Sequence, residues 1–476
     1  MKETSLLSFQ PVILWTDGLI YFLLVCLVCF AFYAVRREHL SAPWRQVRRR
    51  PLVMSALIVL IFYIAVGLTD SIHFRRQLPA TEENQEVQYS PEVLSLLDVL
   101  VDSLKNNNER SYSAPLAAYA YTKEMITGDD GSQRRDYPRL AFGGAHLKNP
   151  ETERRADLLG IVFRGGMAGL VLAGLAASFF LFALARHHRK GFWEMGGLIW
   201  RGECDTAWKA IVFTLGVFIV LNGMLIPLSA KYHLFGTDKV GQDVFYLTLK
   251  GIRTGLVIGT LTTLVMLPFA IFLGISAGYF RGWIDDLIQY LYTTLSSVPG
   301  VLLIAASVLI LQVYMEKHAD AFSSVTERAD IRLLFLCIIL GVTGWIGLCR
   351  LLRGETLKLR ELEYVQAATA LGVGHRAILF RHILPNVMHI VLISVVLDFS
   401  GLVLAEAVLS YVGVGVDPAM ISWGNMINSA RLELAREPVV WWSLCAAFLL
   451  MFGLVLSANV FSDGIRDAFD PRLRGR

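Results

Sequence analysis

Two carboxylates stand within a long apolar stretch near the end of the chain, where ionisable groups are costly. Asp398 lies near the middle of a predicted membrane span at residues 387–412, and Glu406 lies further along it. Charged side chains in hydrocarbon are rare, and they commonly line a transport path or pair with a neighbouring helix. We therefore predict a polar translocation pathway through Asp398 and Glu406. The alternative is that both carboxyl groups make hydrogen bonds between helices.

The sequence gives no sign of an enzyme. It has no glycine-rich phosphate loop ending in Lys-Ser or Lys-Thr and no His-Glu-x-x-His zinc motif. The adjacent residues His187 and His188 do not face one another on a helix, so a metal site there is not expected. We expect no catalytic residue, no metal and no bound cofactor on this chain. Any uphill transport must then draw on an ion gradient or on another polypeptide.

A polar segment between two apolar stretches, EYVQAATALGVGHRAILFRHILPN at residues 363–386, is the second candidate site. Tyr364, Ala368 and Leu371 fall on one face of a predicted helix, and Ala367 lies beside them. Because most of these side chains are small, this face is nearly flat and suits close approach by another surface.

The second half of this segment predicts a turn and another helix. Gly372 and Gly374 supply the backbone freedom for a turn, and a helix is expected from about residue 375 to 384. Pro385 is expected to end that helix, and Asn386 to cap the next span. The result is a helix–turn–helix elbow suited to a groove on a partner protein. The alternative is an amphipathic connector on the membrane surface.

Membrane spans must position these groups, because 55% of the residues are hydrophobic and only 18% are charged. A hydrocarbon core needs roughly 20 apolar residues per helix, and only helices satisfy their own backbone in lipid. We predict an all-α polytopic membrane protein. The nine expected spans lie at residues 12–35, 52–69, 161–185, 209–229, 254–278, 288–313, 331–349, 387–412 and 441–461.

The positions of lysine and arginine predict the orientation of these spans. Basic residues collect after the first, third and seventh spans and at the C-terminus, and such connections stay in the cytoplasm. Examples are Arg36, Arg37, Arg48, Arg186, Arg353, Arg472 and Arg474. The N-terminus is then expected in the periplasm and the C-terminus in the cytoplasm. The net charge of +4 is explained by these connections, so no nucleic-acid partner is expected.

This topology places residues 70–158 outside the membrane. A first helix is predicted there after the cap Ser90-Pro91-Glu92, ending near Asn106, and a second from Pro115 to Gly128. Two amphipathic helices make a thin core, so their apolar faces are expected to rest on neighbouring spans or on a partner. We interpret this segment as a structural cap.

Small residues recur at four-residue spacing in two places, the second of them at the start of the fifth span. In lipid, such rows let helix backbones approach closely. The two rows are Gly165, Gly169 and Ala173, and Gly251, Gly255 and Gly259.

Residues 363–386 resemble the cytoplasmic loop of ATP-binding cassette importer permeases. The family pattern is Glu-Ala-Ala, three residues, Gly, nine residues and Ile-x-Leu-Pro. Gln366 replaces the Glu and His382 replaces the Ile, and both departures resemble the peptide branch of the family. The matching residues are Ala367, Ala368, Gly372, Leu384 and Pro385.

Other stretches resemble the C-type permease subunit of dipeptide and oligopeptide importers, and the likeness runs from about residue 208 to 476. These stretches are HLFGTDKVGQDV (233–244), GYFRGWIDD (278–286), LAEAVLSYVGVGV (404–416), SWGNM (422–426) and DGIRDAFDPRLR (463–474). Within the first, the residues that match the family's periplasmic motif are Gly236, Thr237, Asp238, Gly241 and Asp243. Gln242 stands where the family has arginine.

The resemblance implies a permease subunit whose residues 208–476 form a six-span core and whose loop 351–386 docks on a separate ATPase. The docking residues that it implies are Glu363, Tyr364, Ala367, Ala368, Gly372, His382, Leu384 and Pro385. The implied partners are a second permease subunit, one or two ATPase subunits that hold ATP and Mg, and a periplasmic substrate-binding protein. The implied location is the bacterial inner membrane, and the implied cargo is a peptide.

The remaining stretches are additional to that core. They are residues 1–69, with two extra spans and a basic connection, residues 70–158, and residues 159–207, with a third extra span. A second hypothesis is a membrane scaffold or sensor that recognises a ligand through residues 70–158. An ion-coupled carrier is disfavoured, because it needs no elbow and the chain shows no inverted repeat.

Overall fold

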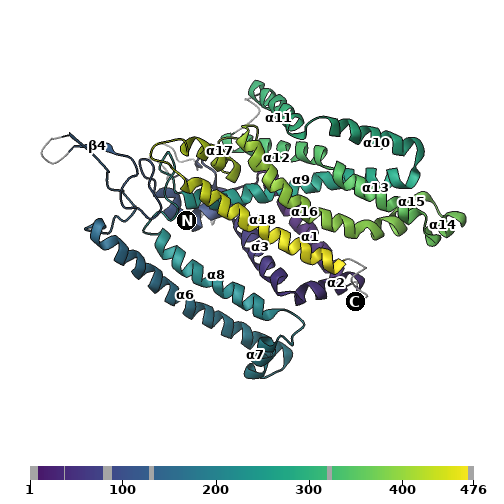
Figure 1. The fold of residues 1–476 in the computed structure, drawn as a ribbon, viewed down its shortest axis with the longest axis horizontal. Coiled ribbons are helices and arrows are strands. Elements are labelled where there is room, and N and C mark those ends of the chain that lie inside the picture. Colours follow the sequence, from purple (N-terminus) through teal and green to yellow (C-terminus); the bar gives the residue numbers. More distant parts are fainter. Residues whose placement is uncertain (1–8, 37, 79–87, 128–132, 319–323, 470–476) are drawn as a thin grey trace, which may run out of the picture. The chain divides into compact units, whose positions relative to one another are not determined.

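The computed structural model describes residues 9–36, 38–78, 88–127, 133–318 and 324–469 (Figure 1). Arg37, Gly128, Arg472 and Arg474 lie outside this part of the chain, as does the end of the motif at residues 463–474. The chain forms two compact units, each assembled from separate stretches. The first comprises Met1–Val12, Trp44–Arg253 and Ile421–Phe461, and the second comprises Ile13–Pro43, Thr254–Met420 and Ser462–Arg476.

Helices dominate the described residues, and eight helical stretches are long and apolar enough to cross a membrane. They are α3 (Pro51–Asp70), α6 (Pro150–His188), α8 (Trp208–Ser229), α9 (Val244–Phe280), α11 (Gly300–Lys317), Val325–Arg360, His375–Tyr411 and Trp442–Ala468. A shorter apolar stretch, Trp15–Cys29, lies in α1 (Trp15–Val35). The prediction of an all-α polytopic membrane protein is confirmed.

Some predicted span boundaries are wrong. The sixth span, expected at residues 288–313, is divided between α10 (Gly282–Ser297) and α11. Val298 and Pro299 between them have extended backbone angles. Proline drives the residue before it out of the helical region and has no N–H to donate, so the helix stops there.

In the first unit, two helices cross at glycines. A Cβ atom added at Gly165 of α6 would lie 2.3 Å from the carbonyl oxygen of Gly223 of α8, and one at Gly169 would lie 2.8 Å from the Cα of Val220. The row Gly165 and Gly169 therefore does bring two backbones together, as expected. Figure 1 shows α6 and α8 side by side along their length.

Two glycines of the second row, Gly251 and Gly259, have aromatic rings as their nearest neighbours. A Cβ atom at Gly251 would lie 2.7 Å from the indole of Trp423, and one at Gly259 would lie 2.4 Å from the ring of Phe399. These glycines make room for large side chains, which the spacing of the row does not reveal.

We predict that Gly165→Val destabilises the protein by about 1–3 kcal/mol, because the added methyl groups force the two backbones apart. The same change at Gly174 of α6 is a matched control, since a Cβ atom there meets no atom within 4 Å. The measurement is the thermal midpoint of each purified variant in one detergent. Equal losses from the two substitutions would contradict the packing described for this crossing.

The predicted extracytoplasmic segment is less helical than expected. Its β2 (His73–Arg76) pairs antiparallel with β1 (Phe9–Val12) and with β3 (Leu94–Ser95), and a separate hairpin joins β4 (Glu124–Thr127) and β5 (Gln133–Asp136). The predicted helix from Pro115 is therefore wrong over its described part. Strand β4 forms because a hairpin partner satisfies its backbone, which local periodicity cannot show.

The first helix predicted in this segment begins later than expected and is broken. Helix α4 (Leu96–Leu100) starts after Ser95, and α5 (Asp102–Asn106) follows a break at Val101. The Ser95 hydroxyl accepts from the Asp98 N–H while the Asp98 carboxylate accepts from the Ser95 N–H. This reciprocal cap satisfies two backbone donors, so the helix begins there and not after Ser90.

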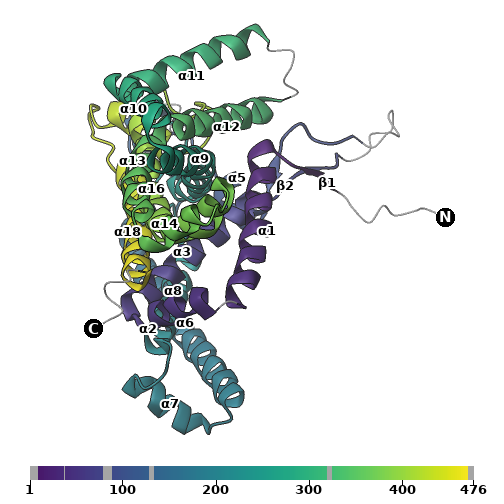
Figure 2. The same ribbon diagram turned by 90° about the vertical axis from the view of Figure 1, so that its right-hand side faces the viewer.

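The second unit is a helical bundle. It holds α9 from Thr254 onward, α10, α11, α12 (Val325–Gly344), α13 (Ile346–Arg360) and α16 (Leu384–Tyr411). Figure 2 shows α11 and α12 as neighbours in this bundle. Helix α1 also belongs to it, because the backbone N–H and hydroxyl of Thr16 both donate to the carboxylate of Asp330 on α12.

Candidate functional site

The predicted elbow is present in the second unit (Figure 1). Helix α14 (Glu363–Ala370) ends at a turn in which Gly372 has a φ of +74°, and α15 (His375–Ile378) follows. The N–H of Val373 donates to the carbonyl of Ala368 at 3.0 Å, which satisfies the end of α14. The positive φ explains why glycine stands at position 372.

The second arm does not end at Pro385, contrary to the prediction. A π-helical turn, Leu379–Ile383, follows α15 and continues directly into α16, so Pro385 lies in the first turn of that helix. Proline cannot donate to a carbonyl in the preceding turn, and the wider π turn accommodates this break without ending the helix.

Asn386 also differs from its predicted capping role. Its side-chain amide donates to the carbonyl of His382 at 2.6 Å and to the hydroxyl of Tyr364 on α14 at 3.1 Å. The two arms of the elbow are thus joined by a side-chain contact.

One side of the elbow is packed into the bundle. Val365, Ala368 and Ile378 have exposed fractions of 1%, 9% and 0%, and they belong to one apolar cluster with residues of α9 and α13. Ala368, predicted as a docking residue, therefore holds the elbow in place and does not contribute to its outer surface.

The other side of the elbow presents apolar side chains outward. Leu371 is 83% exposed and Phe380 is 70% exposed. Of the predicted docking residues, Glu363, Tyr364, Ala367, Gly372 and Pro385 are exposed, and His382 and Leu384 are half-buried. Leu371 and Val373 lie at the turn itself and offer an apolar surface to another molecule, whereas Phe380 lines an apolar pocket with residues of α9.

The elbow is fastened to the end of α9. The Tyr279 hydroxyl lies 2.8 Å from Nδ1 of His375, the first residue of α15. The Tyr279 carbonyl accepts from the Arg360 guanidinium at 2.7 Å. Both contacts come from the motif at residues 278–286, which thus has a positioning role that its sequence did not reveal.

Residues 274–278 read Gly-Ile-Ser-Ala-Gly, a spacing also found in hydrolases, where the serine stands on a sharp turn after a strand. Here Ser276 lies within helix α9. A Cβ atom at Gly274 would lie 2.8 Å from the Cys349 carbonyl oxygen of α13, and one at Gly278 would lie 2.7 Å from that of Arg353. These glycines allow α9 and α13 to touch, and the pattern is not a nucleophile elbow.

The two carboxylates of the predicted pathway have different surroundings in α16. Glu406 is 3% exposed and accepts a hydrogen bond from the Ser410 hydroxyl at 2.8 Å, one helical turn further on. Asp398 is half-buried. The Ser410 bond lies within α16, so it does not show the bond between helices that the structural alternative requires. Asp398 is the more accessible of the two carboxylates, and the pathway stays a prediction.

In the first unit, the Gly-Thr-Asp motif is built around a buried His233. Nδ1 of His233 lies 2.7 Å from the carboxylate of Asp243, and Nε2 lies 3.3 Å from that of Glu109. Glu109 also accepts from three backbone N–H groups, of residues 141–143, at 2.8–3.1 Å. Residues 70–158 and the motif therefore share one buried ionic cluster.

The electrostatics of this cluster follow from its hydrogen bonds. Burial disfavours the imidazolium of His233, but the bonds to Asp243 and Glu109 outweigh it and raise the pKa of His233 to about 9. Burial also opposes ionisation of Glu109, but the hydrogen bonds from His233 and the backbone lower its pKa to about 2. A charged histidine between two carboxylates is therefore expected at neutral pH.

The other residues of the Gly-Thr-Asp motif pack against residues 109–113 or order their own loop. The Thr237 hydroxyl donates to the Ser111 carbonyl at 2.8 Å, and the same hydroxyl accepts from the Ser113 N–H at 2.7 Å. A Cβ atom at Gly236 would lie 2.2 Å from the Ser113 carbonyl oxygen, and one at Gly241 would lie 1.9 Å from that of Glu109. Both glycines also have positive φ. Asp238 accepts from two backbone N–H groups of its own loop.

A second ionic cluster was not predicted from the sequence. The ammonium of Lys250 lies 2.8 Å from the Asp70 carboxylate and 2.9 Å from that of Asp98. Burial opposes the ionisation of Asp98, but the nearby Lys250 and its hydrogen bonds hold the pKa of Asp98 below its usual range. These residues are far apart in the sequence, and no local pattern relates them.

Comparison with known proteins assigns the family. The pattern of binding-protein-dependent transport system inner membrane components matches residues 270–475. The chain is 34% identical over 255 residues to an oligopeptide transport system permease protein of Mycobacterium bovis. The aligned residues cover 53% of this chain and 80% of that protein.

Two further relatives have different stated cargoes. One is a glutathione transport system permease protein of Pectobacterium atrosepticum, 34% identical over 52% of this chain and 75% of that protein. The other is a dipeptide transport system permease protein of Bacillus subtilis, 31% identical over 52% of this chain and 71% of that protein. The chain thus belongs to the family of binding-protein-dependent transport system inner membrane components, as a multi-pass permease subunit.

Proposed function

We propose that this chain forms half of a peptide translocation pathway and that residues 363–386 dock it on a separate ATPase subunit. The names of the relatives support a peptide cargo, because they specify oligopeptide, dipeptide and glutathione transport. The elbow is the observation that carries the proposal. Its inner side is packed into the bundle, and its turn offers the exposed Leu371.

This arrangement suits the transmission of movement between subunits. A partner that binds the outer side pulls on an element whose inner side, at Val365 and Ile378, is closely packed with α9 and α13. Closely packed elements move together and do not deform continuously. Nucleotide-driven movement of an ATPase would then be transmitted to the helices of the bundle, because in the described part of the chain no flexible connection lies between the elbow and those helices to absorb it.

The remaining partners follow from the same proposal. A second permease subunit completes the pathway, a substrate-binding protein delivers the cargo, and ATP and Mg²⁺ are held by the ATPase subunits. The arginine-rich connections support an orientation in a bacterial inner membrane with the elbow on the cytoplasmic side and the Gly-Thr-Asp motif on the periplasmic side. Asp398 remains the better candidate of the two carboxylates for lining the pathway. A scaffold or sensor is not favoured, because the relatives are permeases.

The test of the proposal is peptide uptake by the complete transporter in proteoliposomes with ATP inside or absent. Dipeptides, oligopeptides and glutathione should each be offered as labelled cargo. ATP-dependent accumulation of one class supports the proposal. Uptake that continues without any ATPase and collapses with the proton gradient would contradict it.

Removing one hydroxyl is expected to weaken the link between the elbow and the bundle. Tyr279→Phe deletes the contact with His375 and leaves the ring in place, and such a hydrogen bond contributes about 0.5–1.5 kcal/mol. We predict a roughly 2–10-fold fall in peptide transported per ATP hydrolysed. His375→Phe should give a similar loss, with no larger effect in the double variant. Additive losses would show that the two residues act separately.

A further inference from the structure

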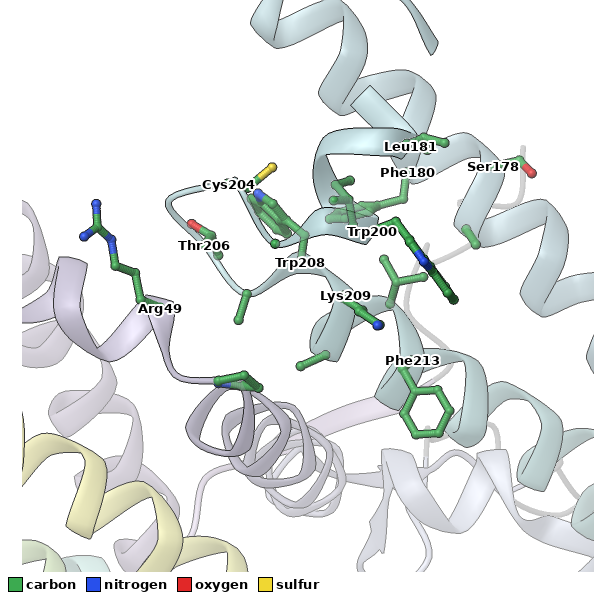
Figure 3. A pocket seen from close by; sticks show the side chains of 18 residues that line it. Arg49, Ser178, Phe180, Leu181, Trp200, Cys204, Thr206, Trp208, Lys209 and Phe213 are labelled. Atoms are coloured by element: carbon green, nitrogen blue, oxygen red, sulfur yellow. The ribbon is translucent and has the colours of Figure 1, made fainter. Parts of the chain in front are cut away.

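An apolar cavity of about 880 Å³ opens in the first unit, where α6 and α8 meet α7 (Phe192–Arg201) and the start of α3 (Figure 3). This volume lies within the range of about 300–1,000 Å³ that is usual for ligand sites. Its apolar wall includes Phe180, Leu181, Ile199, Trp200, Trp208 and Phe213.

Exposed tryptophans beside this cavity indicate a position at the edge of the membrane. Trp200 is 75% exposed and Trp193, also on α7, is 87% exposed. Tryptophan concentrates where the hydrocarbon meets the headgroups. Helix α7 is short and ends in Arg201, which is typical of a helix that lies along this interface.

The rim of the cavity carries more positive than negative charge. Lys209 stands over the Trp200 ring, 4.3 Å from its centre, and in the described part of the chain no carboxylate forms an ion pair with it. Arg49 pairs with Asp205 at 2.5 Å, and both side chains are largely exposed. Among the residues that line the cavity, Arg49 and Lys209 are charged and none is acidic.

We propose that the cavity holds one anionic glycerophospholipid, with an acyl chain against the apolar wall and its phosphate at Lys209. A free phosphate would use only the rim and leave the apolar wall unfilled. A zwitterionic lipid would fill the wall but bring its own cation to a rim with excess positive charge. Basic pockets beside membrane helices bind anionic headgroups for the same reason.

The test uses the full chain with its co-purifying subunits in bilayers that mix phosphatidylglycerol and phosphatidylcholine. Bromine is placed on the acyl chains of one lipid or of the other, at equal mole fraction. Brominated phosphatidylglycerol is expected to quench tryptophan fluorescence more strongly. We call the difference in quenching between the two brominated lipids the excess quenching. The chain has 10 tryptophans, so Trp208→Phe is used to find how much of the excess comes from the cavity, and it should reduce that excess.

Charge variants test where the headgroup lies. Lys209→Glu should remove at least half of the excess quenching, whereas Lys209→Arg should keep it. Lys190→Glu is the matched control, since Lys190 is exposed near the start of α7 but does not line the cavity. Unchanged quenching by brominated phosphatidylcholine in each variant verifies that it is folded in the bilayer.

Three results would overturn the proposal. Equal quenching by the two brominated lipids would show no preference for an anionic headgroup. An equal loss in the Lys209→Glu and Lys190→Glu variants would show only diffuse surface attraction. Loss of the excess on addition of inorganic phosphate would show that the cations bind a free anion and not a lipid.

Discussion

Replacement of one exposed leucine at the elbow should nearly abolish peptide uptake while the protein remains folded. In Leu371→Asp, a side chain that is 83% exposed acquires a charge, so the permease itself has little reason to unfold. In a docked complex the same charge is removed from water without a partner, which costs several kcal/mol. We expect ATPase binding to weaken roughly 100-fold and ATP-dependent uptake to fall in proportion.

The matched variants separate docking from folding. Leu371→Met keeps an apolar side chain and should transport normally. Ala368→Trp is a poor test of docking, because Ala368 is buried in the bundle and the larger side chain would disturb packing first. Normal uptake by Leu371→Asp in a strain that makes the usual amount of protein would contradict the docking role.

The second large effect is expected at Glu109. Glu109→Gln removes the charge that faces His233 and places an N–H₂ group where backbone N–H donors need acceptors. Unsatisfied buried donors, together with the loss of one of the two carboxylates that face the buried imidazolium of His233, cost about 2–4 kcal/mol. We therefore predict a lower thermal midpoint and faster proteolysis of residues 88–127 and 133–148.

A surface pair supplies the control for this substitution. Glu92 pairs with Lys105 at 2.7 Å in the same segment, but its side chain is 63% exposed. Exposed pairs contribute about 0–1 kcal/mol, so Glu92→Gln should be nearly neutral. A similar loss of stability in both variants would show that the buried cluster around His233 has no special role.

The same cluster predicts a pH dependence. The pKa of His233 is raised from 6.5 to about 9 by folding, so its contribution is fully present below pH 6.5 and is lost as the pH rises through about 9. That contribution is roughly 3 kcal/mol. The thermal midpoint should therefore fall between pH 6.5 and 9, and His233→Gln should flatten this part of the profile. An unchanged slope in that variant would rule out His233 as its source.

The spans were predictable because an apolar run in lipid has only one way to satisfy its backbone. The turn at Gly372 was predictable for a similar reason, since few other residues tolerate its positive φ. The continuation through Pro385 was not, because a proline can either end a helix or lie in the first turn of the next one, and the local sequence does not distinguish the two.

The sequence predicts which residues form the elbow but not which of them are buried. The spacing of residues 363–386 gives a helical face, but it does not say that Ala368 points inward and Leu371 outward. Glu109 and His233 are 124 residues apart, and a contact of this range follows from the tertiary fold alone. Likewise, the Tyr279–His375 contact joins two motifs that the sequence presents as separate.

Site-specific photocrosslinking tests the central claim most directly. A photoreactive amino acid is placed at Leu371 in the complete transporter, in native membranes, and the crosslinked partner is identified by mass spectrometry. The control position is Lys317, which is exposed at the end of α11. Lys317 precedes the span Val325–Arg360 and Leu371 follows it, so the two positions are expected on opposite sides of the membrane. The account predicts a phosphate-loop ATPase crosslinked from position 371 and none from position 317. Lipid alone at position 371, or the same ATPase yield from both positions, would contradict it.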